Sequence, residues 1–202
     1  MTKKVSKKER YEALLKMSYN ELVEHLWNKY GAVRDDYFSE KSYNRFVNGE
    51  IKTLNVKKKA KRTEDGLYIH HVDENKYVNP SNAIFVKAWK IPYDVQKKER
   101  LVYCDLFEHL ILHALIGKET RGLYGLGGCR LIRDQIIDSF IDKYPFVRKD
   151  CVNAKRRAYL PPKQAKELLA TIEEFRPFYE TEEELEDNTL TRGLLLDMLE
   201  EE

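Results

Sequence analysis

Long apolar runs are missing from this sequence. No stretch of about eighteen consecutive apolar residues occurs, and a membrane-spanning helix needs roughly that length, so we expect no segment that crosses a membrane. The basic start, MTKKVSKKERYEALLKM, lacks the apolar core and the small-residue cleavage site of a secretory signal. Cysteine is also scarce: Cys104, Cys129 and Cys151 are widely spaced, with no CxxC pair. Free thiols in a reducing compartment fit this usage, and we expect a cytoplasmic protein.

The composition is that of a folded chain with a strongly solvated surface. Hydrophobic residues make up 42% of the 202 positions and charged residues 35%, which favours a real core under a helix-rich exterior. The net charge of +2 hides an asymmetry, because residues 1–62 are strongly basic and residues 173–202 are strongly acidic. This segregation fits a basic nucleic-acid face with an acidic tail kept elsewhere, and it fits equally two solvated helix faces of opposite sign.

Apolar spacing predicts a mainly helical chain with two short strands. Leucines three and four apart predict a helix over 9–30, which Ser18 or Asn20 would interrupt or recap. Residues 67–72 and 101–104 read as strands, and Asp105 with Glu108 predicts a helix cap. The other expected segments are an irregular stretch over 31–56, a long connection over 73–100, a helix ending at Gly117, a flexible turn at 122–128, helices at 131–143 and 163–175, and an acidic amphipathic end.

Four of the five histidines lie in two short clusters, His70 with His71 and His109 with His113. The second pair is four apart on a predicted helix, so both rings project from one face, either as metal ligands or as satisfied boundary residues. A zinc-protease HExxH motif is excluded because Leu110 follows His109. The first pair ends a predicted strand, so its side chains should point to opposite sides. One would then face the helix pair and the other a substrate, as a ligand and a separate base require.

IHHVDEN, a long connection and then LVYCDLFEHLILH together resemble the ββα-metal finger of the HNH (His-Me finger) endonucleases. The variety with a double His and His-x3-His, as in nuclease colicins, is the most similar, and the likeness spans roughly residues 66–117. It implies His70, His109 and His113 as ligands of one divalent ion (Mg²⁺, Mn²⁺, Ni²⁺ or Zn²⁺) and His71 as general base. The implied reaction is hydrolysis of DNA phosphodiesters to a 5′ phosphate and a 3′ hydroxyl.

One position departs from the family pattern. The family places an Asn just before the second strand, where it braces the loop that carries the base, and this chain has Arg100 there. An Arg can donate to the same loop or reach a phosphate, and so would join His71 in the catalytic site, but it cannot accept a hydrogen bond as Asn does. The geometry of this loop is therefore the point at which the chain departs from the family pattern.

The flanks must supply the contacts to DNA, since a finger of this size has little surface of its own. The basic run just before the first histidine pair is expected to contact phosphates without reading sequence, or to be a solvated loop. It comprises Lys57, Lys58, Lys59, Lys61 and Arg62. Arg130, Arg133 and the run from Lys155 to Arg157 are secondary candidates.

We therefore expect an α+β protein, mainly helical with a central ββα-metal finger. The basic helical region would span 1–62, the finger 63–118, and a helical region with an acidic tail 119–202. The expected function is a metal-dependent DNA endonuclease associated with phages, mobile elements or host–phage conflict, as a monomer or a homodimer. The competing expectations are a non-catalytic inhibitor of a nucleoprotein complex, with the acidic tail binding a basic protein partner, and a structural metal module with four His ligands.

Overall fold

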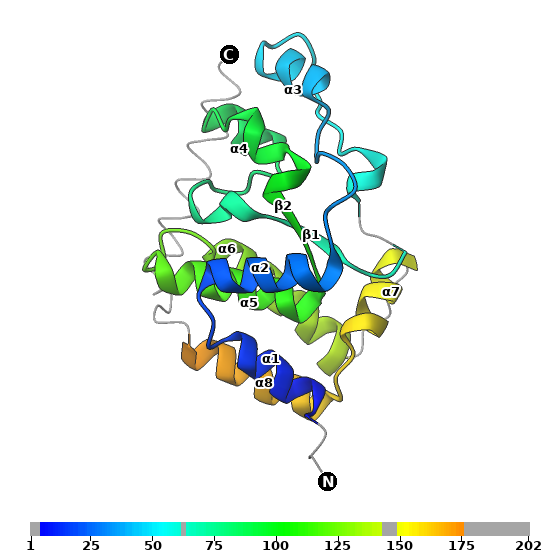
Figure 1. The fold of residues 1–202 in the computed structure, drawn as a ribbon, viewed down its shortest axis with the longest axis vertical. Helices are drawn as coiled ribbons and strands as arrows, with labels where there is room; N and C mark the ends of the chain where they lie inside the picture. The colour runs from blue at the N-terminus through cyan, green and yellow to red at the C-terminus, as the bar shows by residue number, and fades with distance from the viewer. Residues whose placement is uncertain (1–4, 62–63, 143–148, 176–202) are drawn as a thin grey trace.

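The computed structural model describes residues 5–61, 64–142 and 149–175 of the chain (Figure 1). Within these residues no helix is both long enough and apolar enough to cross a membrane. The chain is α+β, mainly helical with one small antiparallel sheet. Its helices and strands are α1 (Lys7–Leu14), α2 (Tyr19–Tyr30), α3 (Glu40–Val47), β1 (Tyr68–His71), α4 (Ala83–Ala88), β2 (Leu101–Cys104), α5 (Leu106–Glu119), α6 (Leu126–Ile136), α7 (Lys149–Ala158) and α8 (Pro162–Phe175).

Three helices begin at reciprocal capping boxes. Ser18 caps α2, its hydroxyl accepting from the Glu21 nitrogen while the Glu21 carboxylate accepts from the Ser18 nitrogen. Ser6 does the same for α1, and Asp105 does so for α5 with Glu108. Each cap satisfies backbone N–H groups that the helix itself leaves unpaired. The helix expected over 9–30 is therefore two helices, and the break falls at Ser18.

The two strands pair antiparallel, with His71 opposite Leu101 and Tyr68 opposite Cys104. Both expected strands are confirmed, and β2 has the expected bounds. The connection between them is not irregular throughout, because it holds α4 and three short 3₁₀ turns: η2 (Val72–Asn75), η3 (Tyr93–Gln96) and η4 (Lys98–Arg100). Strand β2 leads directly into α5 through Asp105, so α5 follows the strand that pairs with β1.

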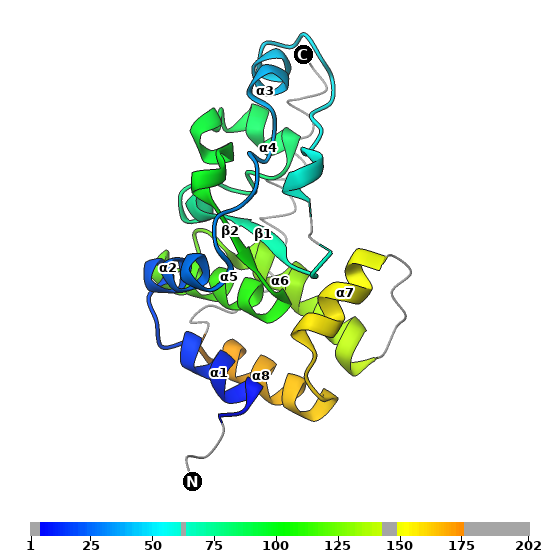
Figure 2. The same ribbon diagram turned by 45° about the vertical axis from the view of Figure 1, so that its right-hand side comes forward.

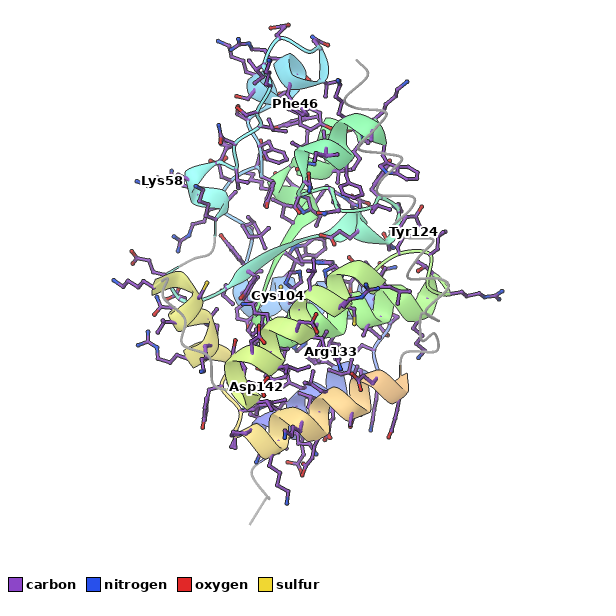
Figure 3. The ribbon with its side chains drawn as sticks, turned by 180° about the vertical axis from the view of Figure 1, so that it is seen from behind. Phe46, Lys58, Cys104, Tyr124, Arg133 and Asp142 are labelled. Carbon is purple, nitrogen blue, oxygen red and sulfur yellow. The ribbon has the colours of Figure 1, made fainter. Side chains whose placement is uncertain are left out.

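Helix α5 lies at the centre of the main core. Its residues from 106 to 117 are buried with the single exception of His109. Helices α2 and α6 flank α5, and α1 and α8 pack together below it (Figures 1 and 2). This core takes side chains from all three ranges into which the sequence was divided. A second apolar cluster, built on Phe38, Tyr43 and Phe46, lies under α3 and α4 (Figure 3).

Several elements differ from the expectations. Residues 31–56, expected to be irregular, contain α3, capped by Ser39. Residues 126–128, expected to be part of a flexible turn, form the first turn of α6. The helix after that turn is α6 followed by one π-helical segment, η5 (Ile137–Ile141). Helix α5 continues past Gly117 to Glu119, because a glycine inside a helix lowers its stability without forcing it to end.

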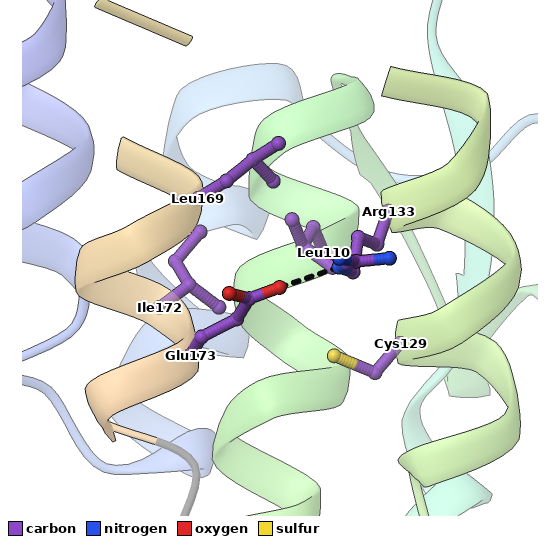
Figure 4. A pocket seen from close by; sticks show the side chains of 6 residues that line it. All are labelled: Leu110, Cys129, Arg133, Leu169, Ile172 and Glu173. Atoms are coloured by element: carbon purple, nitrogen blue, oxygen red, sulfur yellow. Dashed lines mark hydrogen bonds and ion pairs between the residues drawn. The ribbon is translucent and has the colours of Figure 1, made fainter. Parts of the chain in front are cut away.

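A small apolar pocket lies where α5, α6 and α8 meet (Figure 4). Leu110, Leu169 and Ile172 line it together with Cys129, and an ion pair between Arg133 Nε and Glu173 Oε1 (2.5 Å) crosses its rim. None of the four clustered histidines lines this pocket. Arg133, a secondary candidate for phosphate contact, is thus held by a carboxylate.

Candidate metal centre

His70, His109 and His113 converge from two elements, β1 and α5. One ring nitrogen from each lies within 4.8 Å of those of the other two, and the ring centroids are 4.9–5.3 Å apart. His109 and His113 share a face of α5 because they are one helical turn apart. The antiparallel pairing brings His70 opposite Val102, close to the start of that helix. We call these three residues the histidine cluster.

A buried tyrosine fixes the tautomer of His70. The Tyr19 hydroxyl lies 2.8 Å from the Val72 carbonyl oxygen and 2.9 Å from His70 Nε2. A carbonyl can only accept, so the single hydroxyl proton of Tyr19 goes to Val72. The Tyr19 oxygen must then accept from His70, which places the proton on Nε2 and leaves the lone pair on Nδ1. His70 is fully buried, and its Nδ1 has no hydrogen-bond partner among the described residues.

A second relay fixes the tautomer of His71 in the same way. The Gln96 amide donates from Nε2 to the Pro80 carbonyl (3.0 Å), which turns its Oε1 toward His71 Nε2 at 3.1 Å. An amide oxygen can only accept, so His71 carries its proton on Nε2 and its lone pair on Nδ1. Gln96 is completely buried. Its side-chain amide thus contacts both His71 and Pro80, four positions before Arg100.

His71 is less open than the sequence suggested. The pair of histidines does send its Nε2 atoms to different partners, Tyr19 and Gln96. His71, however, is only 1% exposed, and the Tyr37 ring packs edge-on to it with centroids 4.5 Å apart. The outward orientation expected for His71 is therefore not observed in this structure.

Glu74 lies among three of the imidazoles. It belongs to η2, the turn that begins right after β1, and its Oε1 is 3.8 Å from His70 Nδ1 and 3.7 Å from His71 Nδ1. Its Oε2 is 3.5 Å from His113 Nε2. Burial raises the pKa of the Glu74 carboxyl, but attraction to His70 and His113 in their protonated forms and a hydrogen bond with His71 outweigh this and hold the pKa well below its ordinary value. The carboxylate is thus ionised and supplies a negative charge at the histidines.

Burial has the opposite consequence for the imidazoles. It lowers the pKa of His70 to about 3, although Glu74 acts in the raising direction. Burial likewise lowers the pKa of His113, against the effect of Glu74. Both rings are therefore neutral near pH 7, the form in which imidazole binds metals.

Helix α6 packs against the histidine cluster at the His113 ring. A Cβ atom at Gly128 would come within 2.6 Å of three ring atoms of His113, including Nε2 at 2.6 Å. Gly125, which precedes α6 with φ +85°, allows an equally close approach to the His113 carbonyl oxygen. Only glycine permits this spacing between α6 and α5. These glycines therefore position the His113 ring.

The residues present fit a divalent transition metal. One fully buried ring nitrogen, Nδ1 of His70, has no hydrogen-bond partner among the described residues, which is a costly state for a polar atom. Neutral imidazoles with an adjacent carboxylate are the ligands that Zn²⁺ and its neighbours in the first transition row prefer. Mg²⁺ prefers oxygen ligands and matches this set less well.

Arg100 lies outside the cluster and braces the turn that carries Glu74. Its Nε donates to Asp73 Oδ2 at 2.6 Å, and a second nitrogen of its guanidinium contacts Asp73 Oδ1. A two-pronged pair of this kind fixes direction as well as distance. The pair lowers the pKa of the Asp73 carboxyl, against the raising effect of its burial. Arg100 is thus tied to the loop, one of the two roles that the sequence left open for it.

The basic run begins beside the site. The Lys57 backbone nitrogen donates to the Tyr37 carbonyl at 2.9 Å, and the Lys57 ammonium pairs with Asp35. Lys58, Lys59 and Lys61 are exposed on and after the 3₁₀ turn η1 (Lys58–Ala60), on the side of the molecule where α7 also lies (Figure 3). Arg62 and the acidic tail from residue 176 lie outside the described residues.

The secondary basic candidates on α7 have mixed partners. Arg157 donates from Nε to the Asp65 carbonyl at 2.5 Å, and its guanidinium lies 5.7 Å from the centroid of the Tyr30 ring. Arg156 is exposed, and its guanidinium donates to Asn153 Oδ1 at 3.1 Å. Lys155 lies over the Phe140 ring. Of these three candidates, Arg156 is the one whose side chain is exposed.

The site residues that sequence reasoning missed differ in how far a local pattern could have revealed them. Glu74 has a local signal, because it is four positions after His70 and three after His71 on the turn that follows β1. Gly128 was assigned to a flexible turn. Tyr19 and Gln96 carry no local signal, because each is defined by a partner at least 25 positions away.

Comparisons of the chain with models of protein families, with curated proteins and with solved structures found no match. The geometry of the histidine cluster, with the resemblance in its motifs, is therefore what supports a function.

Proposed function

We propose that this chain is a metal-dependent endonuclease of the HNH, or His-Me finger, kind that hydrolyses phosphodiester bonds in DNA. One observation carries the proposal. The histidine cluster gathers three ring nitrogens in one place, and His71, the next residue after His70, points its lone-pair nitrogen toward the same carboxylate. A ligand and a separate base on adjacent positions are what hydrolysis by an activated water needs.

His71 is the general base in this proposal. Its Nδ1 carries the lone pair because Gln96 holds the proton on Nε2. Nδ1 takes a proton from the attacking water, and the positive charge that develops on the ring is favoured by Glu74 Oε1, 3.7 Å away. Gln96 keeps the ring in this orientation throughout.

His70, His109 and His113 would hold the divalent ion. When bound, the ion supplies positive charge that polarises the phosphate and steadies the leaving 3′ oxygen. The protein's own contribution is to keep three neutral donors in place: Tyr19 orients His70, the helical spacing of α5 orients His109, and Gly128 leaves room for His113.

DNA would approach from the side of η1 and α7. The exposed Lys58, Lys59 and Lys61 follow Lys57, whose backbone contacts Tyr37 beside His71. Phosphate contacts from such side chains position a duplex without reading its sequence. Since His71 is 1% exposed, binding of DNA must displace Tyr37 or its neighbours before the base meets a water.

The test is a cleavage panel on duplex, branched and single-stranded DNA and on RNA, with Mg²⁺, Mn²⁺, Ni²⁺ or Zn²⁺. We expect metal-dependent cleavage of DNA that His71→Ala abolishes while the protein retains its metal. His25→Ala is the matched control, since His25 is the one histidine outside the two clusters and is exposed on α2. Equal behaviour of wild type and His71→Ala on every substrate would reject the enzyme.

The burial of His71 favours one second candidate. His71 is 1% exposed, and Arg100 is already paired with Asp73. Both observations are compatible with a non-catalytic protein that keeps the fold as a scaffold, such as an inhibitor of a nucleoprotein complex. That protein would bind metal and a macromolecular partner without cutting. Metal binding by wild type with no cleavage of any nucleic acid would favour it.

A further inference from the structure

Glu74 is the one carboxylate that the described part of the chain brings against three of the four clustered imidazoles. Its two oxygens lie 3.5–3.8 Å from His70 Nδ1, His71 Nδ1 and His113 Nε2. These separations exceed an ordinary N–H···O hydrogen bond of about 2.7–3.2 Å. The carboxylate side chain is only 14% exposed, so bulk water compensates little of its charge.

The two tautomer relays make this arrangement unfavourable without a cation. Tyr19 fixes the His70 lone pair on Nδ1, and Gln96 fixes the His71 lone pair on Nδ1. Both lone pairs then face the same Glu74 oxygen. A carboxylate that orients a histidine needs an N–H from that ring, and both relays assign the Nε2 proton elsewhere. A positive ion among these atoms resolves the conflict.

The separations also fit shared coordination. Two ligands each about 2.1 Å from one ion in a tetrahedral arrangement lie about 3.4 Å apart. The contact of Glu74 Oε2 with His113 Nε2, at 3.5 Å, and that of Oε1 with His70 Nδ1, at 3.8 Å, are close to this value. The two contacts use different oxygens of Glu74, so this side chain must move before one oxygen joins the nitrogens of the histidine cluster.

Contacts of neighbouring residues fix the backbone of the turn that carries Glu74. Arg100 binds the preceding residue, Asp73, through both carboxylate oxygens. The nitrogens of Lys76 and Tyr77 donate to the Asp73 carbonyl at 2.9 and 3.0 Å, which closes the η2 turn. A carboxylate on a braced turn loses less conformational entropy on binding than one on an unconstrained loop.

We infer that Glu74 is a fourth protein ligand, so that the resting metal centre is a closed site of three histidines and one glutamate. This inference rests on the metal centre of the proposed function and deepens it. A closed four-ligand site of this composition selects Zn²⁺ or Co²⁺ over Mg²⁺. Glu74 also occupies the coordination position that a substrate phosphate needs, so the phosphate must displace it or raise the coordination number.

The experiment is a Co²⁺ titration of the full chain followed by visible absorption, which reports coordination number independently of cleavage. Wild type should bind one equivalent and give the intense bands of four-coordinate Co²⁺. Glu74→Gln should bind at least tenfold more weakly, with weaker bands. Glu99→Gln, a change at an exposed glutamate of the same connection, should behave as wild type, and unfolding curves of the metal-free proteins should show that both variants fold.

The outcomes separate this inference from the proposed function. Equal Co²⁺ affinity and equal spectra for wild type and Glu74→Gln overturn the inference, whether or not the protein cuts DNA. A Glu74-dependent four-coordinate spectrum in a protein that cuts no nucleic acid supports the inference and rejects the nuclease. Absence of Co²⁺ and Zn²⁺ binding by wild type overturns the inference, and absence of cleavage with every metal of the panel rejects the nuclease.

Discussion

Gly128→Ala is the sharpest perturbation that the packing of α6 on α5 offers. In an ordinary helix this change stabilises by up to about 1 kcal/mol, because alanine has the higher helix propensity. Here the new Cβ would lie 2.6 Å from His113 Nε2 and still closer to a carbon of the same ring. Carbon atoms pack at about 3.5–4.0 Å, so the ring or the helix must move by roughly 1 Å.

Such a movement has a cost in stability and a larger cost in metal binding. Overpacking of this size typically destabilises by about 1–3 kcal/mol, which outweighs the gain in propensity, so we expect a net loss of up to about 2 kcal/mol. The displaced His113 ring should lower metal affinity by about 10- to 100-fold, as misplaced supporting groups do. Gly127→Ala is the matched control, because a Cβ there meets nothing within 4 Å.

The assay combines thermal unfolding of the metal-free proteins with a competitive Zn²⁺ titration. Gly127→Ala should be as stable as wild type or more so, with unchanged Zn²⁺ affinity. Gly128→Ala should be less stable and bind Zn²⁺ more weakly. If the two variants are indistinguishable in both measurements, the close approach of α6 does not position His113, and the account of the cluster is wrong.

Three further changes test other contacts. Tyr19→Phe should lower Zn²⁺ affinity about tenfold by freeing the His70 tautomer, measured by the same competition. Gln96→Leu should slow DNA cleavage and leave Zn²⁺ affinity unchanged, because it releases His71 alone; a parallel loss of both would contradict this. Burial, then the nearby Glu108, raises the pKa of Asp105 to about 6, so the folded chain holds this proton more tightly than the unfolded chain. That stabilisation is complete below about pH 4 and is lost as the pH rises through about 6. Asp105→Asn should therefore lose less stability than wild type between pH 4 and pH 7 in denaturant unfolding, and parallel curves would count against the shift.

Local signals predicted the elements around the site well. The bounds of β2 followed from the apolar run LVYC, and the start of α5 from the Asp105–Glu108 capping box. The convergence of His109 and His113 followed from helical spacing alone. Helix α3 was missed although Ser39 caps it and Tyr43 and Phe46 are three apart, because the aromatic residues around it obscured the periodicity.

The remaining parts depend on contacts between distant segments. Tyr19 meets His70 across 51 positions and Gln96 meets His71 across 25, so no window of sequence contains either pair. The role of Gly128 becomes visible only in the packing of α6 against α5, where it allows close contact with the His113 ring. In the sequence alone, an isolated Gly-Gly pair favours a turn. Burial of His71 depends on Tyr37, whose place over the ring is set by tertiary packing.

The pairing of α1 with α8 bears on how this chain folds as it is synthesised. The Lys7 ammonium donates to the Arg157 and Tyr159 carbonyls, and Tyr11, Leu14 and Leu15 share a core with Leu168 and Ile172. Translation at 5–20 residues per second puts on the order of ten seconds between α1 and its partner. Until α8 is made, α1 can pack only on α5, where the Tyr11 and Phe107 ring centroids are 5.2 Å apart. The core around α1 is therefore completed only after residues near the other end of the described chain, Leu168 and Ile172, have been synthesised.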